Sequence, residues 1–394
     1  MLLPAWSRLV VAVLVGVFAA VMPVTAASAH QVGGMGATNF HVTLTAIEPA
    51  VAGVSLRVIE NGGRLELRNE TEAVVVIAGY SGEPYARVGP DGVQVNDSSP
   101  ATVLNAGRFL TTALPATDGQ EAPVWRQVSR DPVWRWHDHR VHWSLTTLPP
   151  GVAAAPDEPH RIRDWTVPLW YGEAMTPMAA AGTLDWVPGP APRPWFTQAA
   201  LLAVGVVALA LLRAPHRLLA GAVGLFAAAY LLHGLGVMVA VAGSVPQQLS
   251  VLFGAESFLV WPIAAVTAVL LWRRRTWAGW LAAGLGLVVA FQVYRGDAAA
   301  WWSSSAPSAL PSTVNRLAIA LVIGLGAGLV LALPVLRRRH GASGQAGAAA
   351  RSGPGAGRPS SVVGSRLQAA AMRSTSASAT STSDSSPTSA GSPT

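Results

Sequence analysis

Three of the nine histidines in this 394-residue chain lie within six positions, in the segment 134–143, WRWHDHRVHW. Alternate side chains of a β-strand point to the same face, so on a strand His137 and His139 would lie together. His142 would join them only if the strand bends. Imidazoles at this spacing could bind copper or, less favourably, zinc, and Asp138 could ligate the ion or orient a ring. The alternative is a packed segment whose histidines form hydrogen bonds.

A second candidate for metal binding depends on processing of the N-terminus. Arg8, the apolar run 9–22 and the small residues 27–29 form an export signal, with cleavage predicted after Ala29. His30 would then become the N-terminus, where its amine and imidazole could chelate Cu(II), with His41 as a further ligand. An uncleaved anchor helix is the alternative for the signal, and coincidence is the alternative for His30.

Five later segments are long and apolar enough to cross a membrane as helices, for which about 20 residues are needed. Eight arginines follow the first, third and fifth of them, which by the positive-inside rule places these loops in the cytoplasm. An exported start followed by five spans also puts the C-terminus in the cytoplasm, so the two clues agree on a multi-pass plasma-membrane protein. The predicted spans are 195–212, 218–242, 249–272, 277–294 and 314–336.

Two ionisable residues stand out inside the predicted spans. His233 and Glu256 lie at similar depths below the outer surface, counting 1.5 Å per helical residue, so they could pair. Such a residue indicates function by default, because an unpartnered charge in a bilayer is costly. The alternative is a hydrogen bond between packed helices.

The exported part, 30–187, is predicted to be all-β. Apolar and polar residues alternate in 40–44, 54–58 and 65–67, and Asn61-Gly62-Gly63 is a hairpin turn signal. Short strands with turns between them predict an immunoglobulin-like or cupredoxin-like sandwich. We expect long loops in 98–130, a proline-rich stem in 188–194, and a disordered cytoplasmic tail in 340–394, whose small and polar residues cannot form a core.

Composition narrows the classes of function. All 27 basic residues are arginine, yet segment 30–193 carries 17 acidic against 12 basic residues, so the excess positive charge lies outside the exported domain and nucleic-acid binding is not expected. The chain has no cysteine, which excludes disulfides and thiolate chemistry. No catalytic constellation is recognised: Ser144 lies near His142 but lacks a nucleophile's turn context.

Several motifs carry a resemblance to known proteins. GYSGEPY at 79–85, GPDGV at 89–93, SPA at 99–101 and the histidine segment together resemble a group of uncharacterised actinobacterial membrane proteins, which implies an exported β-domain with five spans but no activity. A histidine heading an exported β-domain is more loosely similar to CopC-type copper proteins. Three hypotheses follow: copper binding or trafficking by the exported domain, a non-enzymatic envelope scaffold that binds a protein partner, and transport through the helices.

Overall fold

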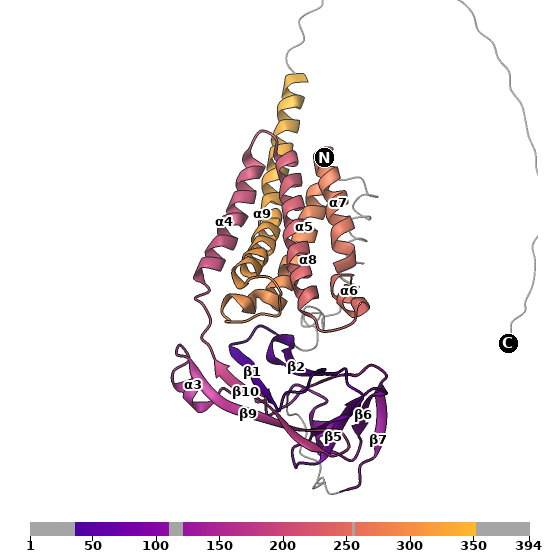
Figure 1. The fold of residues 1–394 in the computed structure, drawn as a ribbon. Helices are drawn as coiled ribbons and strands as arrows, with labels where there is room; N and C mark the ends of the chain where they lie inside the picture. The colour runs from indigo at the N-terminus through magenta and orange to yellow at the C-terminus, as the bar shows by residue number, and fades with distance from the viewer. Residues whose placement is uncertain (1–35, 110–120, 254–256, 352–394) are drawn as a thin grey trace, which may run out of the picture. The chain divides into compact units, whose positions relative to one another are not determined.

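The computed structural model describes residues 36–109, 121–253 and 257–351. A mostly antiparallel β region comes first and helices follow (Figure 1). The predicted export signal, His30, Glu256 and the tail beyond residue 351 lie outside the described residues, so these predictions remain as they stand.

The described residues of the β region form ten strands. They are β1 (Phe40–Glu48), β2 (Val54–Ile59), β3 (Arg64–Asn69), β4 (Val75–Ala78), β5 (Pro84–Gly89), β6 (Gly92–Asn96), β7 (Trp125–Ser129), β8 (Val133–Trp136), β9 (His160–Tyr171) and β10 (Thr176–Trp186). Short helical turns lie between them: η3 (Glu60–Gly62), α2 (Pro100–Leu104) and α3 (Pro150–Ala154). The segment 98–130, expected to be loops, therefore contains a helix and a strand.

The strands form two antiparallel sheets. Seven pair in the order β1-β10-β9-β4-β5-β6-β7, and three pair in the order β2-β3-β8. The hairpin predicted at Asn61 to Gly63 is confirmed, because β2 and β3 pair across it and Ile59 lies opposite Arg64. Asn61 and Gly62 have φ of 53° and 87°, left-handed conformations that asparagine and glycine adopt most readily.

Apolar side chains from both sheets form one core. Leu65 and Leu67 from the three-stranded sheet are fully buried, as are Ile77 and Val88 from the seven-stranded sheet. Strand β4 is buried along its whole length between β9 and β5, as its continuous apolar sequence predicts. This shared core positions the chain that leaves β8, where the histidine segment continues.

Four helices in the described chain are long and apolar enough to span a membrane, and a bent pair would make a fifth. The long ones are α4 (Arg193–Leu211), α5 (Pro215–Ala240), α8 (Ala278–Asp297) with the short η4 (Ala298–Trp301), and α9 (Ser312–Arg351). The bent pair, at 43°, is α6 (Val245–Phe253) and α7 (Ser257–Trp272). The span predicted at 249–272 corresponds to this bent pair.

Two other boundaries differ from the predictions. Helix α9 continues to Arg351, so the first part of the segment expected to be disordered from residue 340 is helical. Helix α4 begins at Arg193, inside the predicted stem. The part of α9 that is apolar enough to span a membrane is Ser312–Arg339. The residues of the helix after Arg339 are mostly small or polar.

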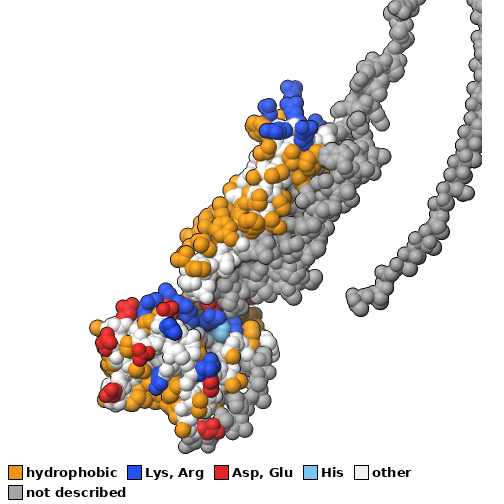
Figure 2. All heavy atoms as spheres, turned by 90° about the vertical axis from the view of Figure 1, so that its right-hand side faces the viewer, with side chains coloured by type: hydrophobic (Ala, Val, Ile, Leu, Met, Phe, Trp, Pro, Cys, Tyr) orange, Lys and Arg blue, Asp and Glu red, His pale blue; other side chains and the backbone are white. Residues whose placement is uncertain are grey.

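Helices α8 and α9 approach closely through glycine. A Cβ at Gly286 would lie 2.6 Å from the backbone oxygen of Gly326, and the reverse distance is 2.7 Å. Small residues at such crossings let the helix backbones approach closely. Inside a membrane, where the hydrophobic effect does not drive helices together, such packing stabilises their association. Basic side chains gather at one end of the helical region, while its side is hydrophobic (Figure 2). We call this the arginine end; it carries Arg213, Arg217, Arg273, Arg274, Arg275, Arg337, Arg338 and Arg339.

Candidate functional site

The histidine segment does not continue as a strand. Strand β8 ends at Trp136, and the next residues turn, with the backbone oxygen of Asp138 accepting hydrogen bonds from the amides of Val141 at 2.9 Å and His142 at 3.4 Å. The expectation that His137 and His139 share a strand face is therefore wrong. The turn instead supplies the bend that His142 needs to approach the other two.

The structure brings the three imidazoles of this turn together. The ring centroids of His139 and His142 are 5.3 Å apart, and those of His137 and His142 are 5.9 Å apart. The three residues are 7%, 8% and 2% exposed, in chain order. Arg163 on β9 holds the turn by donating to the backbone oxygens of His139 at 2.9 Å and His142 at 2.8 Å.

The ring nitrogens of the three histidines have different partners. His137 uses both: Nδ1 donates to the Gly63 oxygen at 2.7 Å, and Nε2 accepts from Arg64 Nε at 3.2 Å. His139 and His142 each donate Nε2–H to a backbone oxygen, of Gly107 at 3.0 Å and of Arg108 at 2.9 Å. Their buried Nδ1 atoms have no hydrogen-bond partner within the described residues.

The rings of His137 and His142 are neutral near pH 7. Burial lowers the pKa of each to about 4, against the opposing effect of the hydrogen bonds to Gly63 and Arg108. The positive charge of Arg108 lowers both pKa values further. A neutral ring that donates through Nε2 presents a lone pair at Nδ1, so His142 has the electronic form of a metal ligand.

A buried ion pair lies beside the three rings. Arg140 binds both carboxylate oxygens of Asp138, at 2.9 and 2.7 Å, and also donates to the backbone oxygens of Ala78 and Gly79. Trp136 Nε1 donates to the same carboxylate at 3.0 Å. Burial alone raises the pKa of Asp138, but these hydrogen bonds outweigh it and hold the pKa below its usual value. Asp138 is therefore a structural anchor in this geometry.

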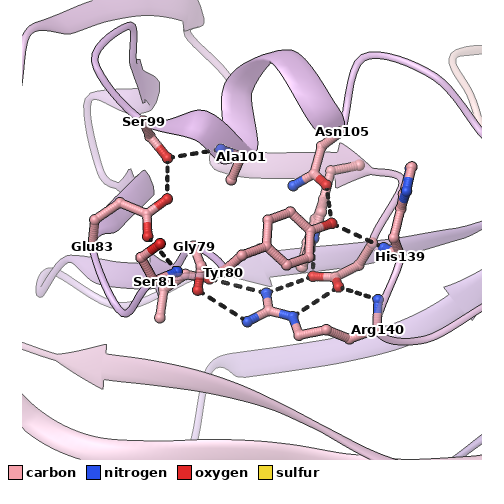
Figure 3. Close-up of polar contacts among 12 residues, drawn as sticks. Gly79, Tyr80, Ser81, Glu83, Ser99, Ala101, Asn105, His139 and Arg140 are labelled. Carbon is pink, nitrogen blue, oxygen red and sulfur yellow. Dashed lines mark hydrogen bonds and ion pairs between the residues drawn. The ribbon is translucent and has the colours of Figure 1, made fainter. Parts of the chain in front are cut away.

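Two further motifs from the sequence meet the same network (Figure 3). The Tyr80 hydroxyl accepts a hydrogen bond from the His139 amide and donates to Asn105 Oδ1, while the Arg140 guanidinium lies over the Tyr80 ring. Glu83 accepts from the Ser99 hydroxyl at 2.6 Å and from the Ser81 amide at 2.9 Å. Motifs at 79–85, 99–101 and 136–143 thus converge on one polar cluster, which fixes the histidine turn.

Within the described residues no group of three His, Cys, Asp or Glu side chains is arranged to hold a metal ion. The surroundings of the rings are also basic, because Arg64 and Arg108 act on His137 and Arg108 acts on His142. Glu60 offsets part of this charge through its interactions with Arg64 and Arg108. The largest set of open imidazole nitrogens in this turn is the pair of Nδ1 atoms on His139 and His142.

His41 lies elsewhere, at the start of β1. Its Nε2 is 2.8 Å from the hydroxyl of Ser304, in the loop that precedes α9. Thr38 and Ser305 form a β-bridge beside it, exchanging two backbone hydrogen bonds of 2.9 and 3.0 Å. His41 is therefore part of a contact between the first strand and the loop Trp302–Pro311, rather than part of the histidine turn.

A second buried site lies among the helices. His233 on α5 places Nδ1 2.9 Å from Asn315 Oδ1 on α9 and Nε2 3.3 Å from Asp297 Oδ2 at the end of α8. These residues are 1%, 3% and 9% exposed, for His233, Asn315 and Asp297. The expected partner of His233, Glu256, is outside the described residues, and Asp297 occupies the pairing position. The sequence predicts neither Asp297 nor Asn315 as a partner of His233.

Comparison with known proteins adds no assignment: no family model, curated protein or solved structure matches this chain.

Proposed function

We propose that this chain is a multi-pass plasma-membrane protein whose β region lies outside the cytoplasm and handles copper in its monovalent form. The eight arginines at one end of the helices support a cytoplasmic position for that end. The β region then lies on the opposite side, in agreement with the export signal predicted in 1–29. Two sheets around one core are compatible with a sandwich of the immunoglobulin or cupredoxin kind.

One observation carries the copper proposal: the Nδ1 atoms of His139 and His142 are buried and have no hydrogen-bond partner within the described residues. A buried acceptor without a hydrogen-bond partner destabilises the folded protein. A bound metal ion would remove this cost by accepting the nitrogen lone pair. Both rings are held through Nε2–H by backbone oxygens, the arrangement that orients metal-binding histidines.

The geometry favours a metal that accepts two ligands. Metal–imidazole bonds are about 2 Å long, so two nitrogens on opposite sides of one ion lie about 4 Å apart. Two rings bound in line to one ion have centroids about 6 Å apart, so the rings of His139 and His142, whose centroids are 5.3 Å apart, must separate slightly to bind in this way. Zn(II) prefers four ligands in a tetrahedron, whereas Cu(I) is stable with two nitrogen ligands in line. The basic surroundings also disfavour a divalent ion relative to a monovalent one.

The experiment is a competitive Cu(I) titration of the full chain, purified in detergent. We expect one ion per chain, and affinity at least about 100-fold weaker in His139→Ala/His142→Ala, since loss of an outer partner alone costs 10–100-fold. His160→Ala is the matched control, because His160 Nε2 donates to the Ala155 oxygen and the residue lies outside the cluster. Equal affinity in all three chains would remove the proposal and leave these rings a packing role.

A second candidate function, capture of an envelope protein, is favoured by strand β7. This strand is the last of the seven-stranded sheet, and Val124 and Val128 beside and within it are 58% and 37% exposed. An edge with exposed apolar side chains can accept an added strand. A chain that is indifferent to metal, and whose complex with one envelope protein is lost in Val128→Lys, would support this function instead.

A further inference from the structure

We infer that His233 and Asp297 hold one exchangeable proton between them, and that this proton controls how the loop Trp302–Pro311 is held on the helices. This proton does not depend on copper binding. His233 Nδ1 lies 2.9 Å from Asn315 Oδ1, within hydrogen-bond distance. An amide oxygen can only accept, so Nδ1 carries a hydrogen.

The other ring nitrogen, Nε2, determines whether His233 is charged. His233 Nε2 lies 3.3 Å from Asp297 Oδ2. Without a further proton, a lone pair on Nε2 would face a carboxylate oxygen, and two acceptors repel each other. One proton between them turns the contact into an ion pair of zero net charge. Its loss leaves one uncompensated negative charge at a site that is 1% and 9% exposed, which is costly in a protein interior.

Other charged groups on the neighbouring elements are held by their own contacts. Arg316, next to Asn315 on α9, donates to the backbone oxygens of Ala300 at 2.8 Å and Ser303 at 2.9 Å. Arg295 on α8 lies over the Phe291 ring. Among the described residues the charge on His233 therefore depends chiefly on Asp297.

The loop Trp302–Pro311 lies directly against this site. A cavity of about 10 Å³, enough for at most one water, is bordered by His233, Asp297 and Asn315, by Ala306 and Pro307 of the loop, and by Gly36 and Ala37. The Ala309 amide donates to the Gly236 oxygen at 2.9 Å, about one turn along α5 from His233. A Cβ at Gly236 would lie 2.5 Å from the Ser308 hydroxyl, so the loop rests on the helix backbone.

The loop in turn binds the start of the β region. Thr38 and Ser305 exchange two backbone hydrogen bonds, and the Ser304 amide donates to Asn39 Oδ1 at 2.7 Å. A charge imbalance beneath the loop is therefore transmitted to the contact between Thr38 and Ser305. The expected behaviour is a tight contact while the proton is present and a looser one after it leaves.

Introduced disulfides test this directly, because the chain has no cysteine of its own. Residues that exchange both backbone hydrogen bonds have Cα atoms about 5.5 Å apart, within disulfide range. The reporter is Thr38→Cys/Ser305→Cys in the full chain. The matched control is Thr43→Cys/Thr183→Cys, a cross-strand pair within the β region that responds to the pH dependence of the thiols alone.

Relative to the control pair, reporter cross-linking should fall as pH rises from about 5 to about 9, the range in which histidines titrate. The ratio of closed to open contact should change by at most about tenfold per pH unit, because one proton is involved. Adding His233→Gln/Asp297→Asn should make the ratio independent of pH. A reporter that parallels the control pair in the otherwise unchanged chain would overturn the inference, and so would a fall that persists in the double substitution.

Discussion

Both the β region and the helical region bury histidines, but the ring nitrogens have different partners in the two regions. In the β region, backbone oxygens take one nitrogen of His139 and of His142, and the other nitrogen of each faces no partner in the described chain. Among the helices, side chains of Asp297 and Asn315 face both nitrogens of His233. An open lone pair suits a metal ion, whereas a facing carboxylate suits a proton. The same residue type therefore supports two different chemistries.

The ion pair of Asp138 with Arg140 anchors the histidine turn through contacts that do not involve the imidazole rings. Asp138→Ala would leave the Arg140 guanidinium, which is only 20% exposed, without its carboxylate, and breaking a buried pair costs about 3–5 kcal/mol, an upper bound here. We expect a large fall in the unfolding midpoint and loss of any copper binding. Asp97→Ala is the control, since the ion pair of Asp97 with Arg126 is exposed and should matter little. Similar midpoints for the two variants would show that Asp138 does not anchor the turn.

Among the helices, the two members of the pair should depend on each other. His233→Gln or Asp297→Asn alone removes one member and leaves the other buried, at a cost of about 3 kcal/mol. The double substitution should cost less than either single one, with a coupling of about 0.5–3 kcal/mol in a double-mutant cycle. Thermal unfolding in detergent measures this. Strictly additive effects would mean that the two side chains do not interact.

Close backbone packing stabilises the helical region. Gly286→Ala places a Cβ 2.6 Å from the Gly326 backbone oxygen, so α8 and α9 must separate, at about 1–3 kcal/mol. Gly221→Ala on α5 is the control, because nothing lies within 4 Å of its Cβ, and alanine favours the helix by up to about 1 kcal/mol. Equal stability of the two variants would contradict the close α8–α9 approach.

The smallest effect is expected at Glu66, on β3. Burial raises the pKa of Glu66, but hydrogen bonds from Arg57 and Arg135 outweigh this and lower the pKa overall. Because the folded pKa lies below the unfolded one, the stabilisation is present above about pH 4.5 and is lost as pH falls through the lowered folded pKa. Glu66→Gln should therefore flatten the acid limb of the stability profile. An unchanged acid limb would show that the two arginines do not stabilise the carboxylate.

Local patterns predict much of this structure. Alternation and the Asn61-Gly62 turn identify β2 and β3, and apolar runs locate the helices to within a few residues, because these features depend on neighbours in the chain. The break between α6 and α7 and the extension of α9 to Arg351 carry no comparable local signal.

The sites are predicted less well, since they depend on residues far apart in sequence. His137, His139 and His142 are visible as a group, but the turn after Trp136 is not. The oxygens that hold the rings of His139 and His142 come from residues 107 and 108, and Asn315 lies 82 residues from His233. Asp297 lies within one helical turn of the end of the predicted span 277–294. A carboxylate in that position is the one sequence feature that could have predicted a partner for His233.

Copper binding by the histidine turn can be tested by the copper X-ray absorption spectrum of the full chain loaded with one equivalent of Cu(I). We expect two nitrogen neighbours in line, and loss of that signal in His139→Ala/His142→Ala but not in His160→Ala. Three or four ligands, or a spectrum that is unchanged in the double variant, would contradict it.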